Sequence, residues 1–236
     1  MRNITTIATK EFKSYLSSPM AYVVTGIFLA LTGFFFSFSP STYFETSVRG
    51  FLEAGGMLLL LLASVLTMRL LAEEKKLGTI ELLLTSPIRD SDVVLGKFLG
   101  SVYILAAMLG LTLYYPTLLL IFGDPDLGPI GTGYLGLFLL GATSLAVGLF
   151  ASSLTANQIV AAVTSGGILF ALWFIGAAAD FLPKALGQFV NYLSLSYYFP
   201  DFMRGIVDTR GIVYYVSITI LFLFLSIRSL ENSRWN

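Results

Sequence analysis

The feature that most constrains this chain is a run from Leu127 to Ala179 that contains no charged residue. A helix rises 1.5 Å per residue, so this run is too long for a single crossing of a hydrocarbon layer of roughly 30 Å. A polar cluster near its middle predicts a break between two membrane-spanning helices. The cluster consists of Ser152, Ser153, Thr155, Asn157 and Gln158.

Four further runs are apolar and long enough to cross a membrane, which brings the number of predicted spans to six. The composition agrees, because 12% of the residues are charged and soluble domains have roughly 25%. A β-barrel is excluded because runs such as LLLLLASVL are apolar on every face. The predicted fold is all-α integral membrane, a single domain over 1–236 with spans at 20–38, 54–72, 94–122, 131–152, 158–179 and 211–228.

The basic residues predict the orientation of these spans, because Lys and Arg are retained on the cytoplasmic side. The first apolar run lacks a signal-peptide cleavage site, so it is expected to remain as an anchor. Both termini are therefore expected to be cytoplasmic, in the plasma (inner) membrane of a bacterium. One side has Arg2, Lys10, Lys13, Arg69, Lys75, Lys76, Arg89, Lys97, Arg228 and Arg234; the other has Arg49, Lys184, Arg204 and Arg210.

The residue types that are missing exclude several classes of function. The chain has no Cys and no His, which excludes thiolate nucleophiles, imidazole bases and the commonest transition-metal ligands. A serine or zinc intramembrane protease is excluded for the same reason. No phosphate loop of the form GxxxxGK[ST] occurs, and the net charge of zero does not favour nucleic acid. No catalytic residue, metal site or cofactor is expected on this chain.

Residues 1–18 are predicted to form an amphipathic helix before the first span. Apolar side chains recur near helical spacing, with basic residues between them, until Ser17-Ser18-Pro19 breaks the pattern. The interpretation favoured is a helix lying in the membrane surface. The alternative is an ordinary short cytoplasmic segment that leads into the first span. The apolar positions are Ile4, Ile7, Ala8, Phe12, Tyr15 and Leu16.

The segment between the second and third spans is predicted to contain a short helix at 78–86. Gly78 breaks the preceding helix, Thr79 caps the next one, Glu81 favours its positive end and Pro87 terminates it. An apolar face forms at Ile80, Leu83 and Leu84. This face either docks on a partner or lies back on the membrane.

The same segment carries a family resemblance. The letters EEKKLGTIELLLTSP, followed by DSDVVLGK, resemble the signature loop of ABC-2 type transporter permeases. The resemblance implies an N-terminal elbow helix, a cytoplasmic coupling helix and a re-entrant external hairpin at 180–210 before span six. It assigns the elbow to Lys10, Glu11 and Phe12, and ATPase coupling to Glu74, Gly78, Thr79, Ile80, Glu81, Leu82, Leu83, Ser86 and Pro87.

The resemblance also implies partners. A separate P-loop ATPase subunit, itself a dimer, would bind ATP and Mg, and a second permease copy or a related permease would face this one through spans two and five. The opening KEFKSYLSSPMAYV is similar to permeases of gliding motility and of nitrous-oxide-reductase maturation. External accessory proteins are compatible with both of these kinds of permease. The resemblance is compatible with export and with mechanical transmission. A membrane scaffold and an ion-coupled secondary transporter are the alternatives.

Three features within or beside the spans remain open to two interpretations each. Residues 180–210 form either the re-entrant hairpin or an amphipathic loop, because Pro183 and Pro200 exclude one continuous helix. Tyr114-Tyr115-Pro116-Thr117 either lines a cavity or, as favoured here, has a structural role. Small residues are expected to pack helices closely before they form any substrate site. These are Gly136, Gly141, Ser144, Gly148 and Ala151, with Gly166 and Gly167 in the fifth span.

Overall fold

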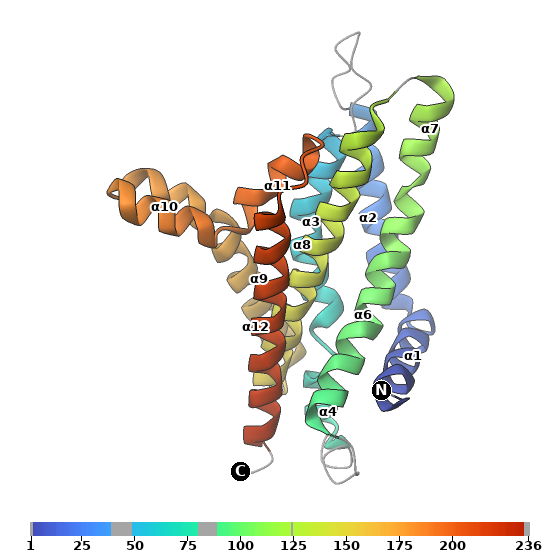
Figure 1. The fold of residues 1–236 in the computed structure, drawn as a ribbon. Coiled ribbons are helices and arrows are strands. Elements are labelled where there is room, and N and C mark those ends of the chain that lie inside the picture. Colours follow the sequence, from blue (N-terminus) through green and yellow to red (C-terminus); the bar gives the residue numbers. More distant parts are fainter. Residues whose placement is uncertain (1, 39–48, 80–88, 124, 234–236) are drawn as a thin grey trace.

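A computed structural model describes residues 2–38, 49–79, 89–123 and 125–233 (Figure 1). These residues form helices joined by short connections and contain no strand. The elements are α1 Arg2–Leu16, α2 Pro19–Phe38, α3 Arg49–Thr67, α4 Ala72–Lys76, α6 Asp90–Thr112, α7 Tyr114–Phe122, α8 Leu127–Leu154, α9 Gln158–Phe174, the 3₁₀ helix η1 Ile175–Phe181, α10 Lys184–Leu193, α11 Leu195–Met203 and α12 Thr209–Ser233.

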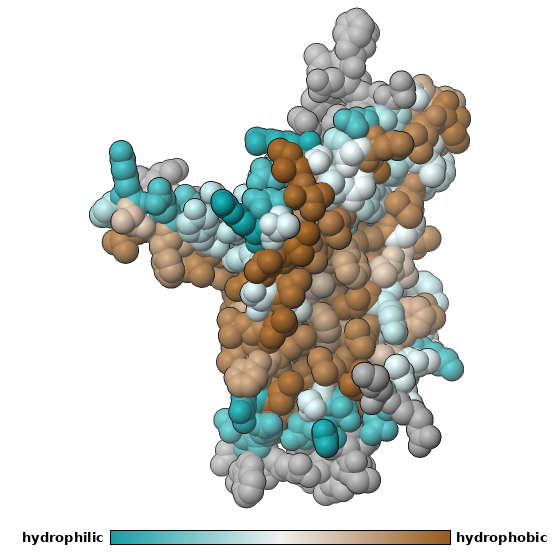
Figure 2. Space-filling model, viewed as in Figure 1, coloured by the Kyte–Doolittle hydropathy of each residue, from teal (hydrophilic) through white to brown (hydrophobic). Residues whose placement is uncertain are grey.

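Six helical segments of the described chain are long and apolar enough to cross a membrane, which confirms the predicted all-α fold with six spans. Helix α1 and the last turns of α12 lie at one end of the bundle, called here the terminal end, and α10 and α11 lie towards the opposite end (Figure 1). On the face seen in Figure 2, hydrophobic residues cover the middle of the bundle, and hydrophilic residues lie towards both ends. The segments are Pro19–Ser37, Gly50–Lys76, Asp90–Phe122, Leu127–Leu154, Gln158–Ala179 and Thr209–Asn232.

Two helices, α6 and α8, begin before the apolar runs from which their spans were predicted. α6 begins at Asp90, before the predicted start of span three, because the carboxylates of Asp90 and Asp92 suit the positive end of a helix. α8 begins at Leu127, where the carboxylate of Asp126 accepts a hydrogen bond from the Gly128 backbone at 2.9 Å. Hydropathy marks the part of a helix that suits lipid, and capping residues mark where the helix begins.

α8 is the centre of the bundle and packs against α3, α6, α9, α11 and α12. Its glycines allow this, since a Cβ at Gly136 would lie 2.8 Å from Phe202 and one at Gly141 would lie 2.7 Å from Leu105. A Cβ at Gly148 would collide with the hydroxyl of Thr67 on α3. The expected close packing is thus confirmed for these glycines of α8.

The two glycines of α9 differ from those of α8. A Cβ at Gly166 would touch only the Ser64 hydroxyl, at 3.8 Å, and a Cβ at Gly167 would meet no described atom within 4 Å. Gly167 therefore has no close packing partner within the described part of this chain, and its predicted role in close helix packing stays a prediction. On the same helix Ile159 and Val163 are 72% and 70% exposed. α9 thus presents an apolar face that no described part of this chain covers.

The third span is broken at Leu113, between α6 and α7. Pro116 lies in the first turn of α7, where a proline is tolerated. The Tyr115 hydroxyl donates to the Leu29 carbonyl oxygen on α2 at 2.7 Å, and a Cβ at Gly33 would lie 2.9 Å from that hydroxyl. The structural interpretation of this tyrosine therefore holds, because it joins the third span to the first.

The segment before α12 contains two short helices. α11 packs against α8 and α9, whereas α10 contacts η1 and projects sideways from the bundle (Figure 1). The Ser194 hydroxyl accepts a hydrogen bond from the Ser196 backbone at the start of α11, which separates the two helices. Re-entry of this segment into the membrane remains a prediction.

Candidate functional site

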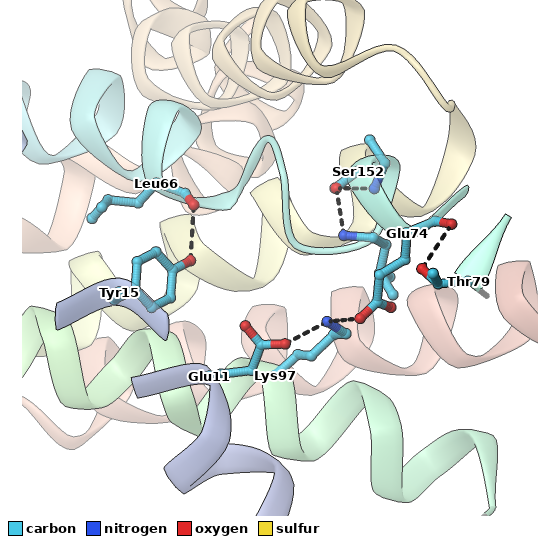
Figure 3. Close-up of polar contacts among 9 residues, drawn as sticks. Glu11, Tyr15, Leu66, Glu74, Thr79, Lys97 and Ser152 are labelled. Atoms are coloured by element: carbon cyan, nitrogen blue, oxygen red, sulfur yellow. Dashed lines mark hydrogen bonds and ion pairs between the residues drawn. The ribbon is translucent and has the colours of Figure 1, made fainter. Parts of the chain in front are cut away.

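A buried lysine joins three helices at the terminal end. Lys97 lies in the second turn of α6, and its side chain is 3% exposed. Its ammonium contacts Glu11 Oε1 on α1 at 2.6 Å and Glu74 Oε1 on α4 at 2.8 Å (Figure 3). These three residues are called the Lys97 cluster. Because a buried ammonium is costly without partners, the two carboxylates stabilise this arrangement of helices.

Two glycines on α6 allow α1 to approach Lys97. A Cβ at Gly96 would lie 2.7 Å from the Ile7 side chain, and one at Gly100 would lie 2.6 Å from Cβ of Glu11. The two helices therefore pack with their backbones close together, as small residues four apart permit. This close approach brings the Glu11 carboxylate within reach of Lys97.

Ser152, near the end of α8, fixes the start of α4. Its hydroxyl oxygen accepts hydrogen bonds from the backbone N–H groups of Leu71 and Ala72, both at 3.0 Å, and donates to the Met68 carbonyl oxygen at 3.1 Å. The first N–H groups of a helix have no partner within it. A buried side chain on the central helix thus takes the place of a local cap (Figure 3).

The neighbouring carbonyl oxygen of Ser153 binds two further elements. It accepts a hydrogen bond from the ammonium of Lys75 on α4 at 2.5 Å and another from the hydroxyl of Ser229 on α12 at 3.1 Å. The last carbonyl groups of a helix lack partners within it, and a cation is favourable there. The end of α8 therefore connects α4 to the last span.

The connection from α1 to α2 is held against the end of α3. The buried phenol of Tyr15 donates to the Leu66 carbonyl oxygen at 2.8 Å (Figure 3). The guanidinium of Arg69 lies 5.2 Å from the centre of the Tyr15 ring and donates to the Ser18 hydroxyl at 2.9 Å. Burial raises the pKa of the Tyr15 phenol, which therefore remains a donor at neutral pH.

The charges of the Lys97 cluster do not balance, since it combines one ammonium with two carboxylates. Glu74 Oε2 is buried and has no hydrogen-bond partner among the described residues. A hollow of about 240 Å³ lies beside the cluster and is lined in part by Tyr15, Arg69 and Leu77. A displacement of α4 would separate Glu74 from Lys97 and expose further charge. The cluster therefore makes the position of α4 depend on that of α1 and α6.

The structure brings some of the predicted site residues together and leaves others apart. Glu11 and Glu74, predicted for different elements, meet at Lys97. Phe12 packs edge-on against Tyr103 of α6 with ring centres 5.9 Å apart, and Lys10 is exposed. The apolar face of α1 packs on the bundle at Ala8 and Tyr15, although Leu16 is exposed.

The predicted coupling segment is described only at its start. Gly78 has φ +69°, a left-handed conformation that ends α4 and suits glycine. The Thr79 hydroxyl donates to the Glu74 carbonyl oxygen at 3.3 Å. Its predicted capping role stays a prediction, because the turn that it would cap lies outside the described residues. The predicted roles in ATPase coupling also stay predictions for the residues that lie outside the described ranges, which are Ile80, Glu81, Leu82, Leu83, Ser86 and Pro87.

The sequence interpretation missed Lys97, Ser152 and Ser153 as parts of one site. A signal for Lys97 was present, because it is a charged residue between two glycines at the start of an apolar run. A helix that begins at Asp90 places Lys97 two turns inside, at a depth where a lysine needs a partner. Ser152 gave no such signal, since buried serines in spans are common packing residues.

One comparison with known proteins decides the family. The family model described as "ABC-2 family transporter protein" matches residues 5–201, from α1 through most of α11. The chain belongs to the ABC-2 transporter family. No curated protein matches it.

Membership in the ABC-2 family makes this chain a multi-pass membrane subunit of an ABC transporter, the permease, which works with an ABC ATPase subunit. ABC-2 permeases are membrane transport subunits that generally lack an ATPase site of their own. The family match includes Glu11, Glu74 and Lys97. The Lys97 cluster thus lies within the matched region, at the terminal end of the bundle.

Proposed function

We propose that this ABC-2 permease couples ATP hydrolysis on a separate ATPase subunit to movement of its helices, for export or for mechanical transmission across the membrane. The observation that carries the proposal is the position of Lys97, which joins α1 and α6 to α4 directly before the segment 78–86. A force applied to that segment would reach α4 first. Through Glu74 and the Ser152 and Ser153 contacts it would then act on α6, α8 and α12.

The proposed docking surface is the apolar face of residues 78–86, and ATP with Mg would be bound by the partner ATPase. The proposed topology places the terminal end in the cytoplasm of a bacterium, with the chain in the inner membrane. Support comes from the basic residues, since those of α1, α4, the start of α6 and the end of α12 lie at the terminal end. Arg49, Lys184, Arg204 and Arg210 lie at or beyond the opposite ends of the spans.

Docking of the ATPase is tested by substitution of one apolar residue of the proposed surface. Leu83→Asp is expected to abolish the stimulation of ATPase turnover by the permease, because a carboxylate cannot enter an apolar socket without a partner. Leu83→Met is the matched control and should retain stimulation. The measurement is ATP turnover of the copurified complex in vesicles, with insertion of both variants verified by protease protection. Full stimulation by Leu83→Asp would refute the docking surface.

A second permease copy is the proposed neighbour of α9. The support is the exposed apolar face of α9, where Ile159 and Val163 are exposed and Gly167 has no described neighbour, whereas the glycines of α8 pack closely. Gly167→Leu is expected to leave the unfolding temperature of the monomer unchanged and to weaken self-association at least tenfold. Single-molecule photobleaching in vesicles measures this, and Gly110→Leu on α6, which also has no neighbour within 4 Å, is the control. Unchanged self-association would refute this interface.

The similarity of the opening segment to gliding-motility and nitrous-oxide-reductase permeases supports a role in driving external accessory proteins, and makes mechanical transmission part of the proposal. Purification from native membranes distinguishes the candidates. Recovery of a P-loop ATPase together with external proteins fits transmission, and an ATPase alone fits export. Recovery without any ATPase would favour a membrane scaffold or an ion-coupled secondary transporter.

A further inference from the structure

A hollow of about 350 Å³ lies at the end of the bundle opposite the termini, among α10, α11 and the start of α12. Its lining includes the aromatic rings of Tyr192, Tyr197 and Tyr198. The Lys97 cluster and the α9 face have no part in it. The volume suits a group of several polar atoms rather than a single ion.

Three tyrosine rings line this hollow, and the plane of the Tyr197 ring is nearly perpendicular to those of the other two. The ring centres of Tyr192 and Tyr197 are 5.6 Å apart with planes at 77°, and those of Tyr197 and Tyr198 are 5.0 Å apart with planes at 89°. Tyr192 and Tyr197 are about half exposed, so their faces are accessible. Aromatic faces arranged as a box attract ammonium groups.

Charges of both signs line the same hollow. Asp201 and Asp208 contribute carboxylates, and Arg204 and Arg210 contribute guanidinium groups. Among the described residues no ion pair of 4.0 Å or less joins these four side chains, since the pairs found are those of Lys97 and Arg228. Both signs are thus available to a ligand. Guanidinium groups suit phosphate and carboxylates suit ammonium.

A local contact holds one of these groups, the Asp208 carboxylate, in place without pairing it with a cationic side chain. Asp208 Oδ1 accepts a hydrogen bond from the Arg210 backbone N–H at 2.9 Å, which fixes the carboxylate at the start of α12. Burial raises the pKa of the Tyr198 phenol, with smaller contributions from Tyr197 and Tyr192, so this wall is neutral at physiological pH. The hollow therefore offers two positive groups, two negative groups and uncharged aromatic faces.

The position of α10 places the hollow at a membrane surface. Leu186, Phe189 and Leu193 fall on one face of α10 and are exposed, although they are apolar. Figure 2 shows hydrophobic residues along the lower edge of this projecting arm and hydrophilic residues along its upper edge. A helix of this kind lies at the boundary between acyl chains and headgroups. The hollow, beside the polar edge of α10, is then at headgroup level.

We infer that this hollow binds the zwitterionic headgroup of a membrane phospholipid, with its ammonium against Tyr192, Tyr197 and the carboxylates and its phosphate against Arg204 and Arg210. A lipid with an ammonium, such as phosphatidylethanolamine, satisfies both signs of charge. A lipid with a glycerol headgroup offers only the phosphate. The inference does not depend on coupling to an ATPase.

The test is native mass spectrometry of the full chain released from micelles that contain phosphatidylethanolamine and phosphatidylglycerol in equal amounts, with the same acyl chains. The wild type is expected to retain phosphatidylethanolamine in about tenfold preference. Asp208→Asn, which keeps an oxygen for the Arg210 backbone, and Tyr197→Ala should each reduce the preference to near unity. Arg204→Gln should lower retention of both lipids, because both carry phosphate.

Lys184→Gln is the matched control, since Lys184 is on α10 but does not line the hollow. This variant should prefer phosphatidylethanolamine over phosphatidylglycerol to the same extent as the wild type. Equal retention of the two lipids by the wild type would overturn the inference, as would a preference that survives both Asp208→Asn and Tyr197→Ala. Free phosphoethanolamine is added in a parallel experiment. If it displaces the lipid at equal concentration, the hollow recognises a soluble compound and the assignment to a membrane lipid is wrong.

Discussion

Substitution of Lys97 by Met is expected to lower the free energy of unfolding by about 3–5 kcal/mol, because it leaves two carboxylates in a mostly buried site without their ammonium. The carboxylates of Glu11 and Glu74 are 16% and 19% exposed, so water only partly replaces the lost partner. The loss is measured by reversible unfolding in mixed micelles. A second measurement, ATP turnover of the copurified complex, is expected to lose its stimulation by the permease.

A charge-balanced variant separates the lost lysine from the stranded carboxylates. The triple variant Lys97→Met, Glu11→Gln, Glu74→Gln removes all three charges and is expected to recover part of the lost stability, since an unpaired amide costs less to bury than an unpaired carboxylate. Glu231→Gln breaks the exposed pair with Arg228 and should change stability by less than about 1 kcal/mol. Should Lys97→Met be as stable as the wild type, the cluster would have no role in holding α4.

If the triple variant is stable but still fails to stimulate ATP turnover, the charges themselves are needed for coupling. If it is stable and stimulates normally, the cluster serves the fold alone. This distinction matters because a buried lysine with two glutamates is not the most stable way to fill the site. An apolar residue would pack there without desolvated charge. A site whose contacts change during the proposed coupling would account for this choice.

The sequence predicted the elements of this bundle well and their contacts poorly. Hydropathy revealed six spans because the preference of each span for lipid depends only on its own residues. The Lys97 cluster depends instead on pairs separated by 86 and by 23 residues along the chain. No periodicity within α1, α4 or α6 indicates which carboxylate meets which ammonium. The family resemblance predicted an elbow and a coupling segment, but it did not indicate that Lys97 joins α1 to α4.

The hydrogen bonds of Ser152 are a second set of contacts that local sequence patterns could not predict. Its partners, the N–H groups of Leu71 and Ala72, lie 81 and 80 residues earlier in the sequence. A capping residue is normally sought next to the helix that it caps. Here the cap comes from the centre of the bundle, so local rules placed the break near Gly78 but could not say what holds α4 in position.

The close packing around α8 leads to the second large prediction. Gly148→Leu is expected to lower the free energy of unfolding by at least about 3 kcal/mol, because even a Cβ at this position collides with the Thr67 hydroxyl and lies 2.9 Å from Thr67 Cβ and 3.1 Å from the Ser165 hydroxyl. α3 and α9 would both have to move. Since α4 follows α3 directly and Ser152 is one turn after Gly148, the displacement should also disturb the hydrogen bonds that hold α4.

The control for this variant is Gly110→Leu, on the exposed side of α6, where a Cβ would meet no described atom within 4 Å. That variant should be neutral or more stable by up to about 1 kcal/mol, since leucine favours a helix over glycine. Thr67→Ala removes the hydroxyl in the way of the new side chain and should restore part of the loss caused by Gly148→Leu. If Gly148→Leu were as stable as Gly110→Leu, then α3 and α8 would not be in the close contact on which the position of α4 depends.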